Sequence, residues 1–217
     1  MSSSAIIVDM KDIRRGIRFL RKACPMMRHI HDRTGEPPLR RYRADFAGLA
    51  RIVTGQQLSI ASAAAIWSRV ETGLTAVTPE RILASSPEQL AAFGLSRAKI
   101  KTLNAAALAI ATGAMSLDAL NESSDETIRG ALTSVSGIGP WTADIYVMFC
   151  LGRRDAWAAG DLALQVGVAE ALDLGKRPNA SELEQIAERW RPWRGVAARL
   201  IWANYALRRG AAPQQKT

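Results

Sequence analysis

The sequence has few of the residues that build metal clusters and disulfide frameworks. Its 217 residues include two cysteines, Cys24 and Cys150, and two histidines, His29 and His31. Two distant cysteines cannot form a four-cysteine zinc or iron–sulfur site. In a reducing compartment such cysteines are usually buried thiols and not a disulfide. We therefore expect no divalent metal centre built from these side chains.

Long apolar runs are also missing. No run reaches the roughly 18–20 apolar residues that span a bilayer. The start, MSSSAIIVDM, lacks the basic region and the long apolar stretch of a signal peptide. With 48% apolar and 23% charged residues, the composition is that of an ordinary folded chain. We expect a cytoplasmic protein, associated with the nucleoid if it is bacterial.

Acidic residues are outnumbered, with 20 Asp and Glu against 29 Lys and Arg, which gives a formal net charge of +9. Such an excess on a small chain favours a polyanionic partner: nucleic acid, an anionic membrane surface or a polyanionic substrate. A basic surface that serves only solubility is the remaining alternative. Charge alone does not choose among them.

Alternating strand patterns are scarce, and helical periodicity runs through most of the chain. The segment 60–71 places five apolar residues on one helical face, namely Ile60, Ala63, Ala64, Trp67 and Val70. The segment 96–113 does the same with Ile100, Leu103, Ala107 and Ile110, and ends at Gly113. The best strand candidate is the short AIIV at 5–8. We expect about ten helices and no substantial sheet.

Helix starts are marked by capping residues. Pro79 follows Thr78, and three pairs have the capping-box spacing: Ser86 with Gln89, Ser123 with Glu126, and Ser181 with Glu184. The proline- and charge-rich RTGEPPLRRYR (33–43) predicts a linker after an N-terminal helix at about 9–23. A second loop, GRRDAWAAG (152–160), separates the central helices from the last ones.

The most informative stretch is SVSGIGPWTADIYVMFC, residues 134–150. It predicts a helix over 124–134, a tight turn, and a second helix over 140–151. Gly137 and Gly139 remove side chains that would shield main-chain N–H groups, and Pro140 suits the first helical turn. N–H groups at a helix start bind anions, including a DNA phosphate. A plain αα-turn would need glycine as well, so the turn alone does not decide.

The longer pattern LTSVSGIGPWTADIYVMFCLGRRDAWAAGDLAL (132–164) resembles the helix–hairpin–helix DNA glycosylases. Within that superfamily the chain is similar to the DNA-3-methyladenine glycosylase II family. Three further stretches carry the likeness, which covers about residues 45–207: RIVTGQQLSIASAAAIWSRV (51–70), FGLSRAKIKTLNAAALAI (93–110) and AERWRPWRGVAARLIWANYAL (187–207).

The resemblance implies an all-α, two-lobed helix–hairpin–helix glycosylase fold with a cleft between the lobes. The central lobe would be 46–156, and the other lobe would combine 1–45 with 157–217. Larger family members have a β-rich N-terminal domain, for which this chain has too few residues before its helical core. The expected partner is double-stranded DNA containing damaged bases, bound by a monomer.

The resemblance also implies a reaction, the hydrolysis of the N-glycosidic bond of an alkylated purine that is flipped out of the duplex. Asp161 would stabilise the oxocarbenium-like transition state and assist water. Asp161 is equally suited to be a helix N-cap, and the two roles are compatible. The rival carboxylates, Asp144 and Asp155, are expected to be structural or to face DNA.

The family pattern assigns further site residues. Trp141 and Trp202, with Tyr146 beside them, would line the base pocket, where Leu162 replaces a tyrosine of some members. Gly137, Gly139 and Thr142 of the hairpin would bind DNA. Gln57, flanked by Gln56 and Leu58, would fill the hole left by the flipped base. Three main-chain carbonyls, those of Thr133, Val135 and Ile138, correspond to positions that hold a structural Na⁺ or K⁺; no organic cofactor is expected.

Three alternatives remain open at this point. A non-catalytic helix–hairpin–helix protein would bind DNA only, and its sign would be loss of the aspartate. A bifunctional glycosylase/lyase would use a hairpin lysine where this chain has Trp141. A peripheral membrane protein is favoured only by the charge. Among glycosylases, hypoxanthine or ethenoadenine could replace 3-methyladenine and 7-methylguanine as the lesion.

Overall fold

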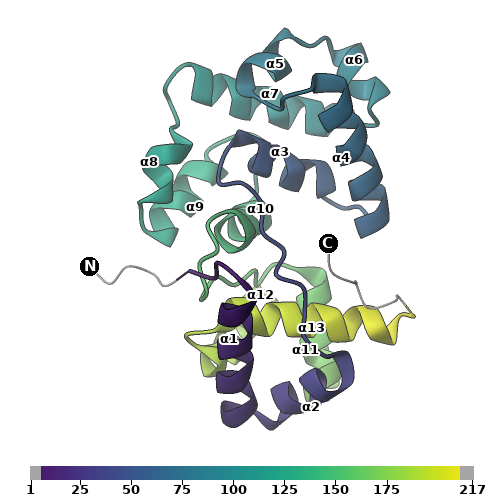
Figure 1. Cartoon of the computed structure of the whole chain (residues 1–217), viewed down its shortest axis with the longest axis vertical. Helices are drawn as coiled ribbons and strands as arrows, with labels where there is room; N and C mark the ends of the chain where they lie inside the picture. The colour runs from purple at the N-terminus through teal and green to yellow at the C-terminus, as the bar shows by residue number, and fades with distance from the viewer. Residues whose placement is uncertain (1–5, 211–217) are drawn as a thin grey trace. The chain divides into compact units, whose positions relative to one another are not determined.

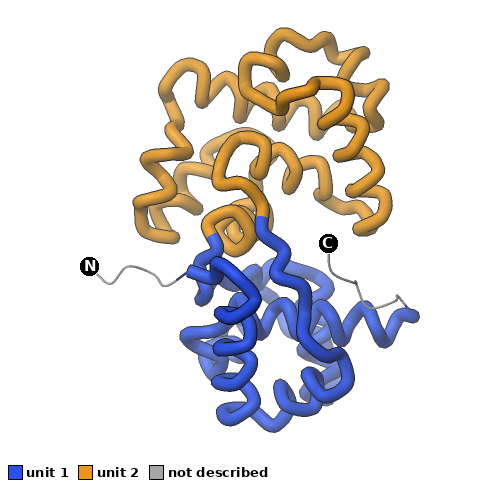
Figure 2. The backbone as a smooth tube through the Cα atoms, in the orientation of Figure 1, with its two compact units in different colours: residues 1–41, 152–217 blue, residues 42–151 orange. Residues whose placement is uncertain are grey.

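The computed structural model describes residues 6–210, which belong to two compact units (Figure 2). Unit 1 combines residues 1–41 with 152–217, and unit 2 is the continuous segment 42–151. These boundaries fall four residues before the first one expected from the sequence and five before the second. Both units are built from helices, labelled in Figure 1.

The described residues contain no strand. Ile6 makes one isolated antiparallel bridge with Arg153, which is all that the expected strand at 5–8 provides; Ala5 lies outside the described part. Beside this bridge Ile7 N donates to Gly152 O at 2.7 Å, and the pairing does not extend into a named strand within the described residues. No helix of the described residues is long and apolar enough to cross a membrane.

Unit 2 forms around α3 (Phe46–Gly55), which packs against α4, α7 and α10. Its other α-helices are α4 (Ile60–Leu74), α5 (Pro79–Ala84), α6 (Pro87–Ala92), α7 (Arg97–Ala111), α8 (Leu117–Asn121), α9 (Asp125–Thr133) and α10 (Pro140–Ile145). Buried aliphatic side chains from several of these helices form the core, among them Leu49, Val53, Ile82, Leu103, Ile128 and Leu132. Burial of these faces is what stabilises the short helices.

The face expected for α4 is buried only in its C-terminal half. Trp67 and Val70 are buried, whereas Ile60 is 59% exposed and Ala64 is also exposed. The periodicity gave the correct helix and the correct side, but its first turn projects beyond the core. Ile60, at the N-terminal end of α4, is therefore a surface residue and not part of the core.

The helix after the glycine turn changes type along its length. α10 continues without a break into a π-helix, η1 (Tyr146–Cys150), in which Leu151 N donates to Tyr146 O at 3.1 Å. The sequence predicted one α-helix over this region. Five buried residues in succession, Tyr146 to Cys150, leave no polar face, so the altered turn lets every side chain pack inside.

Unit 1 joins both chain ends. Its helices are α1 (Met10–Ala23), α2 (Pro25–Thr34), α11 (Leu162–Leu172), α12 (Ala180–Ala187), the 3₁₀ turn η2 (Glu188–Trp190) and α13 (Arg194–Arg208). α13 packs against α1, α2 and α11. α2 was not expected; Pro25 at its first position and Gly35 at its end are the usual start and stop signals. The structure thus has thirteen α-helices in the described residues.

Two of the three expected capping boxes are wrong, because the N-cap lies one or two residues away from the predicted serine. Ser86 and Gln89 form the expected box at α6, and Thr78 caps α5 ahead of Pro79. α9 is capped by Ser124, not Ser123, and α12 by Asn179 with Glu182, not Ser181 with Glu184. In both places more than one polar residue stands near the helix start and could act as the N-cap. The structure uses Ser124 for α9 and Asn179 for α12.

Candidate DNA-binding and catalytic site

The glycine turn between α9 and α10 is held tightly against α7. Gly137 has φ +88°, and a Cβ built on it would lie 1.8 Å from Thr102 Oγ1. Thr102 is itself buried and donates its hydroxyl to Ala98 O at 3.0 Å. Gly137 is therefore required by both its backbone angle and its close approach to α7.

Gly139 has a different environment. It is the N-cap of α10 with φ −92°, and a Cβ there would meet nothing within 4 Å. No side chain caps the first turn of α10. Neither strain nor crowding within the described residues demands glycine at this position. A glycine that leaves the main-chain N–H groups of a helix start uncovered suits the approach of an anion.

Thr142 and Gln56, both expected to bind DNA, bond to each other. Thr142 is 2% exposed, and its Oγ1 accepts a hydrogen bond from Gln56 Nε2 at 2.8 Å. The same Nε2 donates to Gly137 O at 3.3 Å. These side chains join the α3–α4 loop to the hairpin, and the Thr142 hydroxyl is turned away from solvent; contact of either residue with DNA stays a prediction.

Gln57 projects from the loop that Gln56 holds. It is exposed and has φ +56°, which is uncommon for a residue other than glycine. The following Leu58 is 39% exposed. Leu58 N donates to Gly55 O at 3.3 Å, which closes the turn. The Gln57 side chain is thus exposed at the tip of a closed turn, and its entry into a base stack stays a prediction.

Lys99 is a residue of this region that the sequence did not single out. Its Nζ donates to Thr54 O at 2.8 Å, at the C-terminal end of α3, where a cation is favourable. Burial lowers the pKa of the Lys99 ammonium. Lys99 and Thr54 are 45 residues apart in sequence, so no local sequence pattern predicts their contact.

Asp161 in unit 1 is the N-cap of α11. Its Oδ1 accepts two hydrogen bonds, from Leu164 N at 2.9 Å and from Trp202 Nε1 at 2.9 Å. Trp202 comes from α13, which packs on α11. The structure therefore brings Asp161 and Trp202 together, and it shows the N-cap role that the sequence also allowed. The carboxylate is fixed from two elements at the positive end of a helix.

The rival carboxylates are engaged in ion pairs. Asp144 is buried and its Oδ1 lies 2.6 Å from Arg129 Nε, which joins α9 to α10. Asp155 lies 2.5 Å from Arg191 Nη1 and 3.2 Å from the buried Arg194 Nη2. We assign both a structural role, because each balances an arginine of its own unit.

The three aromatic residues expected in a base pocket differ in exposure. Trp141 and Trp202 are half-buried. Tyr146 has no exposed area, its hydroxyl donates to Asn121 Oδ1 at 3.3 Å, and burial raises the pKa of its phenol. The Tyr146 ring thus packs inside unit 2, and its place in a base pocket stays a prediction. Leu162, beside Asp161, is 55% exposed.

The hairpin carbonyls remain candidate ligands for a monovalent cation. Val135 O already accepts Ile138 N at 3.0 Å, which uses one of its two lone pairs. Val135 and Ile138 are buried, while Thr133 is exposed. Neutral main-chain oxygens are the donor type that hard cations prefer, so the chemistry fits Na⁺ or K⁺. The described residues contain no cluster of His, Cys, Asp or Glu that could hold a metal ion.

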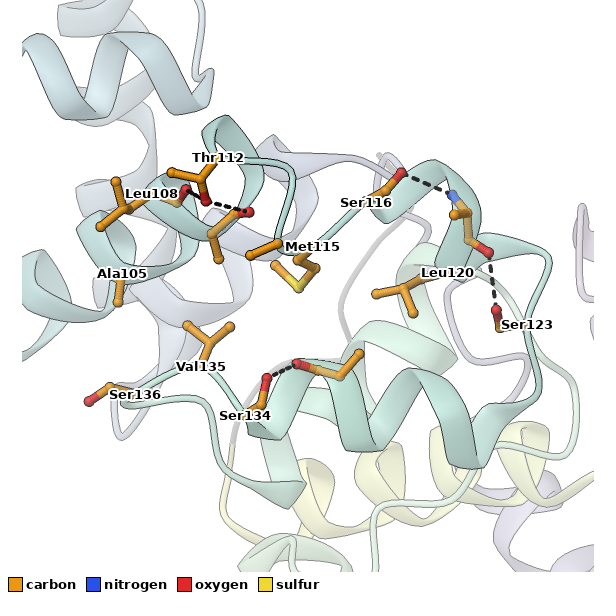
Figure 3. A pocket seen from close by; sticks show the side chains of 14 residues that line it. Ala105, Leu108, Thr112, Met115, Ser116, Leu120, Ser123, Ser134, Val135 and Ser136 are labelled. Atoms are coloured by element: carbon orange, nitrogen blue, oxygen red, sulfur yellow. Dashed lines mark hydrogen bonds between the residues drawn. The ribbon is translucent and has the colours of Figure 1, made fainter.

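A pocket of about 720 Å³ lies in unit 2, between the C-terminal half of α7, α8 and the end of α9 with the first residues of the hairpin turn (Figure 3). Met115, Leu120 and Val135 point into it, and its lining has no ionisable side chain. The hydroxyls of Thr112 and Ser134 are bonded to the helix carbonyls of Leu108 and Ala131, each at 2.8 Å. Because the lining has no ionisable side chain to act as acid or base or to activate a hydroxyl, we assign it no chemistry.

The all-α fold, the glycine hairpin and the capped aspartate define a helix–hairpin–helix protein of the DNA glycosylase class. The family described as HhH-GPD superfamily base excision DNA repair protein matches residues 50–192. The chain belongs to this family.

Individual relatives share the class. The chain is 28% identical over 171 residues to the alkylbase DNA glycosidase-like protein mag2 of Schizosaccharomyces pombe, which covers 76% of this chain and 80% of that one. It is 32% identical over 163 residues to DNA-3-methyladenine glycosylase 1 of the same yeast, covering 73% and 72%.

Solved structures agree. The 3-methyladenine DNA glycosylase Mag1 of that yeast, in complex with abasic DNA, superposes with a TM-score of 0.78 and 26% identity over 93% of this chain and all of that one. A DNA-3-methyladenine glycosidase from Bacillus halodurans gives 0.72 and 27% over 91% of each.

Proposed function

We propose that the protein is a base-excision-repair DNA glycosylase that hydrolyses the N-glycosidic bond of alkylated purines such as 3-methyladenine and 7-methylguanine. The observation that carries the proposal is the Asp161 carboxylate, held at the start of α11 by Leu164 N and Trp202 Nε1. The relatives named as 3-methyladenine DNA glycosylases support the lesion class.

Asp161 acts on the sugar. As the bond between C1′ and the base nitrogen breaks, its electron pair leaves with the base, and positive charge develops on C1′ and the ring oxygen. A fixed carboxylate stabilises that charge without reorganising. Water then adds its oxygen to C1′ and releases a proton, and Asp161 orients the water or takes the proton. The products are the free base and an abasic site.

Trp202 serves both the carboxylate and the base. Its N–H donates in the plane of the ring to Asp161, so the ring faces are not used by that bond. Alkylation at N3 or N7 makes a purine cationic, and cations bind electron-rich ring faces. Trp141, half-buried on α10, is the second ring of this kind.

DNA is held through its backbone. A phosphate bound at the uncovered start of α10, beside Gly139, is positioned without reading a base. Gln57 would replace the flipped base in the stack, because an extruded nucleotide leaves unstacked neighbours. A Na⁺ or K⁺ on the carbonyls of Thr133, Val135 and Ile138 would add positive charge near that phosphate.

We further propose that the enzyme has no lyase activity and needs no divalent metal or organic cofactor. Strand cleavage by a glycosylase requires an amine that forms a Schiff base with the sugar. The hairpin position that supplies it in bifunctional relatives holds Trp141, which has no such amine.

The test is incubation with alkylated genomic DNA in EDTA and identification of released bases by mass spectrometry. We expect free 3-methyladenine and 7-methylguanine. In parallel, a lesion oligonucleotide is run on denaturing gels with and without hot alkali, and with borohydride. We expect strand breaks only after alkali. No base release would refute the glycosylase, and a borohydride-trapped protein–DNA adduct would refute the monofunctional mechanism.

A further inference from the structure

Gln56 occupies a point where two segments far apart in sequence meet. It is the C-terminal cap residue of α3, and its side-chain amide reaches the hairpin 81 and 86 residues further along the chain. One Nε2 donates to Gly137 O at 3.3 Å and to Thr142 Oγ1 at 2.8 Å. Since a main-chain carbonyl only accepts, the amide nitrogen must face Gly137.

The loop that carries Gln56 is fixed from its other side as well. Lys99 Nζ donates to Thr54 O at 2.8 Å, and Thr54 Oγ1 donates to Ala50 O at 2.8 Å. Gln57 follows at φ +56° with its side chain exposed. Such a backbone conformation persists where its surroundings over-determine it. The contacts of Thr54 and Gln56 hold the chain just before Gln57, and the bond from Leu58 N to Gly55 O at 3.3 Å closes the turn just after it.

From this geometry we infer that Gln56 is a positioning residue, which ties the stack-filling Gln57 to the phosphate-binding hairpin. Gln56 presents its amide to the protein, so it does not read DNA itself. Its effect is to fix the spacing between the phosphate held at the start of α10 and the side chain that enters the stack. This inference rests on the proposed function and adds a residue to it.

The role has a distinctive substrate dependence. In duplex DNA, extrusion of the lesion breaks stacking and pairing, and a well-placed Gln57 offsets that cost. In single-stranded DNA there is less stacking to replace. A variant that loosens the loop should therefore slow excision from duplex and leave excision from the single strand nearly unchanged, which loss of general stability would not do.

The variants are Gln56→Glu, Gln56→Ala, Gln57→Ala and the double variant Gln56→Glu/Gln57→Ala. Glutamate has nearly the shape of glutamine but no N–H to donate to Gly137 O. Gln89→Ala is the matched control: Gln89 lies in the same unit, and its Oε1 accepts Ser86 N at 2.9 Å in the α6 capping box, so its loss reports the stability cost of a lost glutamine contact. Single-turnover excision is measured with a 7-methylguanine duplex and with the same strand alone.

We expect each Gln56 variant to slow duplex excision about tenfold, the usual effect of losing one or two hydrogen bonds, with single-strand excision within about twofold of wild type. The double variant should be no slower than the slower single variant, because Gln56 acts through Gln57. Gln89→Ala should excise at the wild-type rate.

A second readout does not depend on catalysis. Fluorescence of 2-aminopurine placed opposite a tetrahydrofuran abasic analogue rises when a side chain disturbs the stack, and we expect the rise to fall in the Gln56→Glu and Gln57→Ala variants alike. Equal losses on duplex and single strand, or losses that multiply in the double variant, would overturn the inference. If the wild-type protein releases no base, the proposed function is refuted. The fluorescence comparison, which needs no catalysis, then still decides the role of Gln56.

Discussion

At the scale of single residues, Asp161 is the N-cap of α11 and carries the proposed chemical role, and asparagine separates the two. Asparagine is a good N-cap and its Oδ1 can still accept from Leu164 N and Trp202 Nε1. The variant Asp161→Asn should therefore keep the fold and the affinity for lesion DNA. It loses the negative charge beside the sugar, which is commonly worth ~3 kcal/mol or more, about a hundredfold in rate.

Single-turnover base release, with thermal unfolding as the control for folding, measures this effect. Asp161→Ala is the companion variant, since it also removes the cap and should cost about 1 kcal/mol of stability. Base release by Asp161→Asn within threefold of wild type would remove Asp161 from the mechanism.

The two tryptophans should differ in which substrates they affect. Trp141→Ala removes an aromatic ring of the proposed base pocket, so excision of cationic 7-methylguanine should fall more than excision of neutral hypoxanthine, by roughly 0.5–2 kcal/mol. Trp202→Ala also removes the donor to Asp161, so it should slow both. Rates for the two lesions, measured side by side for each variant, test this; equal losses in Trp141→Ala would show that its ring only packs.

At the scale of elements, the two hairpin glycines have different reasons to be glycine. Gly137→Ala would place a Cβ against Thr102 at a positive φ, so it should lower the unfolding midpoint sharply. Gly139→Ala has open space around it and should cost at most about 1 kcal/mol of stability. It would cover the helix start, however, and should weaken duplex binding about tenfold.

The control for this comparison is Gly130→Ala, an exposed position of α9 with nothing within 4 Å of its Cβ. It should leave duplex binding unchanged and add slightly to helix stability. Binding is measured by fluorescence anisotropy and stability by thermal unfolding. Wild-type affinity in Gly139→Ala would mean that the phosphate binds elsewhere.

Local patterns predicted most of the helices and the hairpin, but they missed α2 and the π-helical turn η1, and they could not predict contacts between distant segments. The turn before Pro140 and the cap at Asp161 depend on neighbouring residues, so the sequence was enough. The bonds from Gln56 to Thr142 and from Trp202 to Asp161 span 86 and 41 residues, and no periodicity encodes them. The complete burial of Tyr146 depends on the packing of α3 and on the bond to Asn121 of α8, and its position after the hairpin does not predict it.

At the scale of the whole molecule, a net charge of +9 should appear in the salt dependence of DNA binding. Lysines and arginines that meet phosphates release condensed counterions, so log K should fall linearly as log salt rises. Affinity for undamaged duplex, measured from about 50 to 200 mM salt, tests this. A flat plot would contradict a surface that follows the phosphate backbone, and Gly139→Ala should change the intercept more than the slope because it removes no charge.

Unit 2 is one uninterrupted segment, while unit 1 needs both chain ends. The two ends of unit 2 lie next to each other, since Tyr42 N donates to Phe149 O at 2.9 Å. During synthesis on the ribosome, residues 42–151 emerge together and can fold as they appear. α1 and α2, although made first, must wait for α13, against which both pack. The hairpin is thus complete before the aspartate of α11 has its tryptophan, so a nascent chain acquires the turn proposed to bind phosphate earlier than the pair proposed to carry out hydrolysis.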